Sequence, residues 1–213
     1  MKNTKKNILD TSRMLFNKFG YSQVTIRMIA QKLNISSGNL NYHYKKREDI
    51  LKALYFEMVA VFDKRVQQLD TTIITLKKIK EDATSSMIRM VDYRFFWTDL
   101  YYLLSINDNI RTHFEQVRQD RENGYHFVFK TLENNQLLQP ENYPNERQFL
   151  IKRMIDFSNT WLYASHLYRE NITDSKYVET QATILLSILF PYLTEAGKQE
   201  FLELMEEPFG RFY

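Results

Sequence analysis

Small polar and basic side chains are concentrated in one stretch of the chain, residues 25–51, and such groups can hydrogen-bond to phosphates and to base edges. An asparagine amide can bond adenine through N6 and N7 together, so Asn39 and Asn41, with Ser37 beside them, are candidates for base contact. Gly38 would let the protein backbone approach a duplex closely. The residues that we expect to hold phosphates are Thr25, Ser36, Tyr42, Lys45, Lys46 and Arg47.

Some positions in this stretch have simpler interpretations. Ser36 could serve only as the cap of a helix, and Tyr44 is expected to pack into a small core. Arg27 either contacts a phosphate or lies in solvent, and the sequence favours neither. His43 either contacts a phosphate or is a packed or solvent-facing histidine.

Two short helices joined by a tight turn are predicted to position these side chains. Thr25 is a good N-cap for a helix over residues 26–32. Asn34 tolerates the left-handed backbone angles that a tight turn needs. Ser36 or Ser37 then caps a second helix of about two turns. This layout is that of a helix-turn-helix, whose second helix enters the DNA major groove.

The pattern resembles the DNA-binding domain of the TetR family of bacterial transcriptional regulators from about residue 6 to residue 55. The matching residues are Ile8, Leu15, Phe16, Gly20, Thr25, Ile29, Ala30, Ile35, Ser36, Gly38, Leu40, Tyr42, His43, Tyr44, Lys45, Arg47, Glu48, Ile50 and Leu51. The resemblance implies an all-α fold: an N-terminal three-helix DNA-binding domain with a helix-turn-helix, followed by a larger helical domain that binds a ligand and dimerises.

The sequence departs from the family pattern at a few positions. The family usually has alanine-glycine where this chain has Leu33 and Asn34, and lysine where it has Arg47. Leu33 and Asn34 should alter the packing of the turn only modestly. Asn41 matters more, because the tyrosine usual there supports a phosphate contact that asparagine must make differently.

The charge distribution also favours nucleic-acid contact by the N-terminal residues. The chain has 29 Lys and Arg against 26 Asp and Glu. Ten of the basic residues but one acid, Asp10, fall in residues 1–47, which leaves 19 basic and 25 acidic residues in 48–213. A local basic cluster is what phosphate neutralisation requires. We therefore expect a DNA-binding domain over 1–47 and an effector-binding and dimerisation domain over 48–213.

Several functional classes find no support in the sequence. The chain has no cysteine, and it lacks a glycine-rich phosphate loop, a Gly-x-Ser-x-Gly elbow and a His-Glu-x-x-His pair. We therefore assign no catalytic residue, no metal ligand and no cofactor. A helical enzyme with an incidental helix-turn-helix is the least favoured of the functional hypotheses. No apolar run of about eighteen residues is present, so we expect no membrane span and a cytoplasmic protein.

Beyond residue 46 the periodicity of apolar residues predicts helices throughout. A long helix over 47–69 should bury Ile50, Leu51, Leu54 and Met58 on one face, with Val61, Phe62 and Leu69. Loops are predicted at 139–145 and 171–174. The remaining predicted helices cover residues 72–93, 96–105, 108–136, 145–169, 174–193 and 194–206.

The family resemblance implies a homodimer in which residues 145–169 and 174–193 form a four-helix bundle with their copies. The second segment is nearly continuous in apolar residues from Ala182 to Phe190, more than one buried stripe requires. Complete burial within one subunit is the competing explanation. Two-fold symmetry would also place the DNA-binding domains of the two subunits on the paired half-sites of a palindromic operator in double-stranded DNA.

Aromatic residues, 15% of the chain, are frequent in the C-terminal part and could line an apolar pocket. An aromatic residue at helical spacing is more often plain core. Together with these aromatic residues, the family resemblance implies a repressor that a small apolar or aromatic effector releases from its operator. The alternative is a DNA-binding regulator controlled by a protein partner, or one without an effector. The ligand-pocket candidates are Phe96, Trp97, Tyr101, Phe127, Trp161 and Tyr163.

Overall fold

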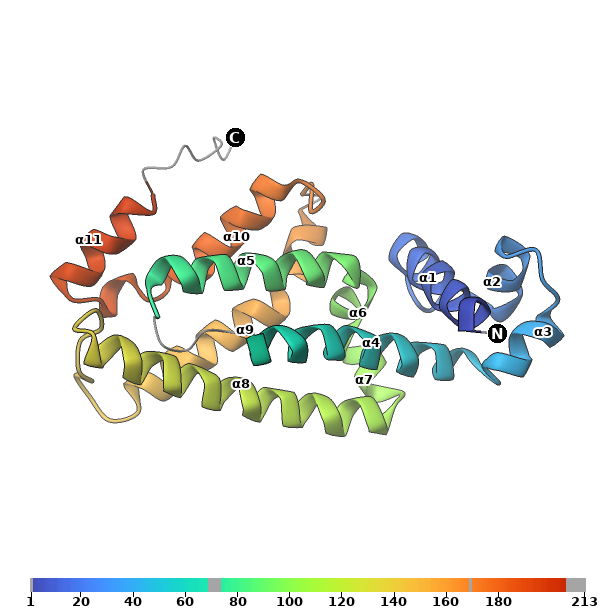
Figure 1. Cartoon of the computed structure of the whole chain (residues 1–213), viewed down its shortest axis with the longest axis horizontal. Coiled ribbons are helices and arrows are strands. Elements are labelled where there is room, and N and C mark those ends of the chain that lie inside the picture. The colour runs from blue at the N-terminus through green and yellow to red at the C-terminus, as the bar shows by residue number, and fades with distance from the viewer. Residues whose placement is uncertain (1, 69–73, 169, 206–213) are drawn as a thin grey trace. The chain divides into compact units, whose positions relative to one another are not determined.

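A computed structural model describes residues 2–68, 74–168 and 170–205 (Figure 1). These residues form helices joined by short connections, so the predicted all-α fold class is confirmed. No helix in this part of the chain is both long and apolar enough to span a bilayer. The helices are α1 (Lys2–Phe19), α2 (Ile26–Lys32), α3 (Ser37–His43), α4 (Arg47–Gln68), α5 (Leu76–Asp92), α6 (Arg94–Thr98), α7 (Leu100–Ser105), α8 (Asp108–Asn134), α9 (Glu146–Leu167), α10 (Ser175–Ser187), the 3-10 turn η1 (Phe190–Tyr192) and α11 (Glu195–Glu203).

The chain divides into two compact units. The first contains α1–α4 together with residues 92–113, which supply α6, α7 and the start of α8. The second contains most of α5, the rest of α8, and α9 to α11. These units are defined by packing. The predicted boundary at residue 47 instead separates the expected DNA-binding role from the expected effector-binding and dimerisation role, and it stays a prediction.

The first unit has a core shared by the N-terminal helices and α6. The Phe16 ring packs edge-on against Tyr21, with ring centroids 5.1 Å apart, and lies 5.2 Å from the ring of Phe95. The apolar face predicted for the long helix α4 is also found here, because Ile50 and Leu54 are fully buried. Val61 and Phe62 are half-buried, and Leu69 lies outside the described residues.

The second unit packs α5, α8, α9 and α10 around apolar side chains. The indole Nε1 of Trp161 donates to the sulfur of Met90 at 3.5 Å, which joins α9 to α5. At the other end of the unit, α11 docks closely. Gly197 lies so near the carbonyl of Leu137 that a Cβ there would be 2.2 Å from its oxygen.

Two predicted helices are interrupted in the structure. The helix predicted over 96–105 is two short helices, α6 and α7, which break at Asp99 with φ −111° and ψ 18°. The helix predicted over 174–193 ends at Ser187, and Pro191 lies in a 3-10 turn that follows it. Proline has no N–H to donate and clashes with the preceding turn, so the α-helix cannot continue through it.

Candidate nucleic-acid interface

The helix-turn-helix is built from two side-chain caps and one left-handed residue. The Thr25 hydroxyl accepts a hydrogen bond from Met28 N at 3.2 Å, and the Ser36 hydroxyl accepts one from Asn39 N at 3.1 Å. Asn34 lies between α2 and α3 with φ +54°. The caps satisfy N–H groups that lack partners at a helix start, and Asn34 turns the chain sharply enough for α3 to pack on α2.

α3 presents a polar face to solvent. Its base-contact candidates Ser37, Asn39 and Asn41 are exposed, as is Gly38. Leu40, in contrast, is fully buried in the first unit. The phosphate candidates Thr25, Ser36, Lys45 and Lys46 are also exposed, together with Arg27, and Tyr42 is 76% exposed. His43 is half-buried beside the Tyr42 ring. The exposed candidates are therefore within reach of a macromolecular ligand.

Arg47 has a contact set that the sequence did not indicate. Its Nη1 donates to the carbonyl oxygens of Tyr21 at 3.1 Å, Ser22 at 3.2 Å and Val24 at 2.8 Å. The guanidinium also lies over the Tyr21 ring, 4.2 Å from its centroid. Arg47 thus fastens the start of α4 to the connection between α1 and α2. The Arg47–phosphate contact remains a prediction beside this structural contact.

Tyr21 completes that fastening on the side of α4. Burial raises the pKa of Tyr21 to about 12, so the phenol stays protonated even at a pH where an exposed tyrosine ionises. Its hydroxyl can then donate to Glu48 Oε1, 3.4 Å away. A lysine, which the family usually has at position 47, could neither stack in this way nor offer a planar fork.

A second set of bonds ties α1 to the corner between α5 and α6. Asn17 Nδ2 donates to the carbonyl of Asp92 at 2.8 Å, and its Oδ1 accepts from Phe95 N at 3.2 Å. Arg13 Nη1 donates to the Tyr93 hydroxyl at 3.1 Å, and that hydroxyl donates to Glu57 of α4 at 2.6 Å. The sequence carries no signal for these bonds, because the partners are 36 to 80 residues apart.

The six ligand-pocket candidates are divided between the two units. Phe96, Trp97 and Tyr101 belong to the first unit, and Phe127, Trp161 and Tyr163 to the second. Phe96 and Trp161 are buried like ordinary core residues. Tyr101 is 86% exposed, and Phe127 and Tyr163 are about half exposed. An aromatic pocket formed by these residues therefore remains a prediction.

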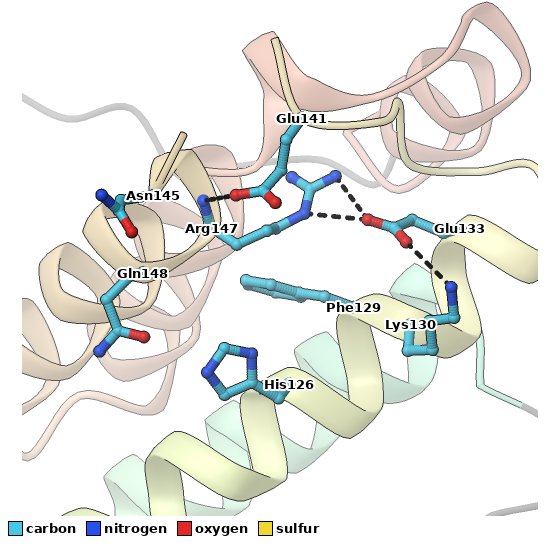
Figure 2. A pocket seen from close by; sticks show the side chains of 8 residues that line it. All are labelled: His126, Phe129, Lys130, Glu133, Glu141, Asn145, Arg147 and Gln148. Atoms are coloured by element: carbon cyan, nitrogen blue, oxygen red, sulfur yellow. Dashed lines mark hydrogen bonds and ion pairs between the residues drawn. The ribbon is translucent and has the colours of Figure 1, made fainter. Parts of the chain in front are cut away.

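A hollow of ≈ 350 Å³ lies between α8 and the start of α9 (Figure 2), and none of those candidates lines it. Buried Arg147 spans it, donating from Nε and Nη2 to Glu133 Oε1 at 3.1 and 2.9 Å, and from Nη2 to the carbonyl of Gln139. Glu141 accepts from Arg147 N at 2.9 Å. These bonds hold the 139–147 segment on α8. We therefore interpret the hollow as part of this structural contact and not as a ligand site. Its lining residues are His126, Phe129, Lys130, Glu133, Glu141, Asn145, Arg147 and Gln148.

Family profiles match the chain in two overlapping parts. Residues 8–54 match the bacterial regulatory proteins of the tetR family, and residues 46–201 match the TetR profile described as a bacterial transcriptional repressor. The chain belongs to the TetR family. It is therefore a DNA-binding transcriptional regulator with a helix-turn-helix, and repression and homodimer formation are typical of TetR-family proteins.

Individual relatives agree with this membership. A TetR-family transcriptional regulator from Marinobacter aquaeolei VT8 is 25% identical, with a TM-score of 0.85 over 96% of this chain and 98% of that one. A TetR transcription regulator from Haloarcula marismortui, 12% identical, shares the fold with a TM-score of 0.66 over 91% and 100% of the two chains. The probable HTH-type regulator YttP of Bacillus subtilis is 26% identical over 72 residues, 34% of this chain and 35% of that protein.

In this TetR-family protein the predicted dimer helices differ in what they leave exposed. Most of the apolar run in α10 is buried within the second unit, including Leu185 and Leu186. Burial within the subunit therefore accounts for much of that run. α9 instead keeps Phe149, Tyr163 and Leu167 at least half exposed. These three positions follow helical spacing along one outer face of α9.

Proposed function

We propose that the protein is a homodimeric repressor that binds a palindromic operator in double-stranded DNA and is released by a small apolar or aromatic ligand. Residues 1–47 would read the DNA, and residues 48–213 would bind the effector and dimerise. The observation that carries the proposal is the exposed polar face of α3, flanked by exposed Lys45 and Lys46. A regulator of this kind works on the chromosome, so we place it in the cytoplasm.

In this proposal the polar face of α3 enters the major groove. Asn39 and Asn41 would contact base edges with Ser37, and Lys45 and Lys46 would neutralise phosphates on either side. Gly38 would keep the start of α3 close to the duplex. Thr25, Ser36, Tyr42, Arg27 and His43 would add contacts to the sugar-phosphate backbone.

The dimer would form through residues 145–169 and 174–193. The exposed Phe149, Tyr163 and Leu167 on α9 support this assignment, because a partner helix would cover them. A two-fold axis would then present two copies of α3 to half-sites about one helical turn of DNA apart.

Release would follow from a shift of α4. Arg47 joins the start of α4 to the connection before α2, and Tyr93 and Asn17 join α4 and α1 to the corner before α6. A ligand that binds better to one arrangement of these helices would move the head away from its half-site. The difference in ligand affinity between the two arrangements sets the size of the response.

The alternative is control by a protein partner, or no control by an effector. It is favoured by the burial of Phe96 and Trp161, which pack as core residues in different units. A ligand that lowers DNA affinity would reject this alternative.

The experiment is selection of tight-binding duplexes from a random pool by the purified protein at physiological salt. We expect an enriched palindrome, which then serves as the probe in a screen for effectors that release it. If a folded protein enriches no sequence, then sequence-specific repression by this chain alone is wrong. Variants of Asn41 would show whether its departure from the family tyrosine is the cause.

A further inference from the structure

Arg121 of α8 is a half-buried cation without an acidic partner. Its Nη1 donates to Asn159 Oδ1 of α9 at 2.8 Å, and the described residues provide no carboxylate within ion-pair distance. The buried cations of the same unit differ, because Lys80 pairs with Glu179 at 3.2 Å and Arg147 pairs with Glu133 at 2.9 Å. A desolvated charge is costly unless it is paired, so the exception calls for a counterion.

The surroundings of Arg121 offer hydrogen-bond donors. Asn159 uses its Oδ1 to accept from Arg121, which leaves its Nδ2 group as a donor. The Tyr125 side chain lies close enough to offset part of the desolvation that lowers the pKa of Arg121. Its hydroxyl can donate in turn. A guanidinium, an amide N–H and a phenol together suit an anionic oxygen acceptor.

The flanks of this cluster are apolar and incompletely covered. Along α8, Val117 and Val128 are half-buried on the same side as Arg121, whereas Phe129 and Leu132 further along are buried. Phe157, two residues before Asn159, is half-buried on α9. One positive charge beside apolar side chains matches a singly charged head on an apolar body, and matches a phosphate dianion less well.

We propose that Arg121 and Asn159 bind the carboxylate of an amphipathic monocarboxylic acid along the seam between α8 and α9. The inference rests on the proposed ligand control and narrows the ligand class to carboxylates. Arg121 would supply the charge and Asn159 Nδ2 a second donor. The apolar body would lie against the half-buried side chains of α8.

The test compares decanoate with decanol, which has the same chain without the charge, by isothermal titration calorimetry on the full chain. We expect decanoate to bind, and Arg121→Gln to weaken it by about tenfold or more, because a hydrogen bond to a charged group is lost. Decanol should bind weakly and equally to both proteins. Arg118→Gln is the matched control, since Arg118 is on the same helix, exposed and paired with Glu122 at 3.1 Å.

Asn159→Asp is a second variant, which keeps the test valid if Arg121→Gln loses binding only because it misfolds. It is nearly isosteric and places a carboxylate on Arg121 from within the protein. We expect it to raise the melting temperature and to abolish decanoate binding. Equal decanoate affinity in wild type, Arg121→Gln and Asn159→Asp would overturn the carboxylate site.

The effector screen separates this inference from the proposed function. If neutral ligands release the operator while decanoate and other carboxylates neither bind nor release it, the carboxylate inference is wrong and ligand control stands. If no compound of any class changes operator affinity, ligand control itself is wrong, whereas the carboxylate site at Arg121 is decided by the calorimetry.

Discussion

Lys46 and Arg47 are adjacent in the sequence, but their side chains lie in different environments. Lys46 is exposed and its side chain forms no hydrogen bond or ion pair with other described residues, whereas Arg47 donates to three carbonyl oxygens before α2. A residue that grips a phosphate contributes to the salt dependence of binding, because its contact releases a counterion. A residue that only positions the DNA-binding domain contributes to DNA affinity but not to its salt dependence.

Lys46→Ala should weaken binding to all DNA sequences similarly and reduce the slope of log K against log salt by about 1. Arg47→Lys keeps the charge but loses the three-carbonyl contact, so it should lower affinity and melting temperature with the slope unchanged. Binding titrations at several salt concentrations measure both effects. A sequence-selective loss in Lys46→Ala would contradict its phosphate role.

Asn39 carries the most specific prediction at the residue scale. Its side chain is exposed on α3 while its backbone N–H is bonded to the Ser36 hydroxyl, so truncation should leave the helix cap intact. Asn39→Ala should cost about 1–3 kcal/mol at one base-pair position and relax specificity there. Affinities for a set of single-base operator variants test this. Uniform weakening across the set would show that Asn39 does not read a base.

At the scale of elements, two helical glycines make opposite demands. Gly197 of α11 packs so tightly that an added Cβ would be 2.2 Å from the Leu137 oxygen, whereas a Cβ at Gly124 of α8 meets no atom within 4 Å. The first glycine is required for docking of α11 on the chain after α8. The second only gives the helix extra freedom in the unfolded state.

Gly197→Ala should therefore lower the free energy of unfolding by about 1–3 kcal/mol, since the backbone of 137 must move. Gly124→Ala should raise it by about 0.5–1 kcal/mol through helix propensity. Denaturant titration followed by circular dichroism measures both. A stabilised Gly197→Ala protein would mean that α11 docks less closely than described.

At the scale of the whole molecule, the exposed outer face of α9 is the proposed dimer interface. Tyr163 lies on that face at 50% exposure and is not needed to fill the core of its own subunit. Tyr163→Glu should therefore leave the subunit folded but shift the dimer towards monomers, because a charge would be buried in the interface. Tyr101→Glu, at an 86% exposed position of the other unit, is the control.

Light scattering gives the subunit number, and DNA titration gives its consequence. The Tyr163→Glu protein should lose its preference for the full palindrome over a single half-site, since two linked heads bind with a higher effective concentration than one. A Tyr163→Glu protein that remains fully dimeric would place the interface elsewhere.

Features that depend on neighbouring residues could be predicted from the sequence. α2 begins and ends where its N-cap and apolar spacing predict, and Asn34 adopts the left-handed angle. α10 starts at Ser175, one residue after the start predicted at 174, and Asp174 caps it. These outcomes follow from backbone sterics, capping and periodicity over a few residues. The end of α10 is also a local feature, because Pro191 lies in the 3-10 turn that follows it, although the apolar run predicted a helix to 193.

The sequence by itself determined the all-α class, the helix-turn-helix and the exposed polar face of α3, since short-range patterns encode them. Only the tertiary structure decided that Arg47 clamps the connection before α2, that Asn17 holds the corner before α6, and that Arg121 meets Asn159 without an acid. These contacts join residues 23 to 78 positions apart. Such pairs come together only when helices pack, and helix packing depends on the shapes of many side chains at once.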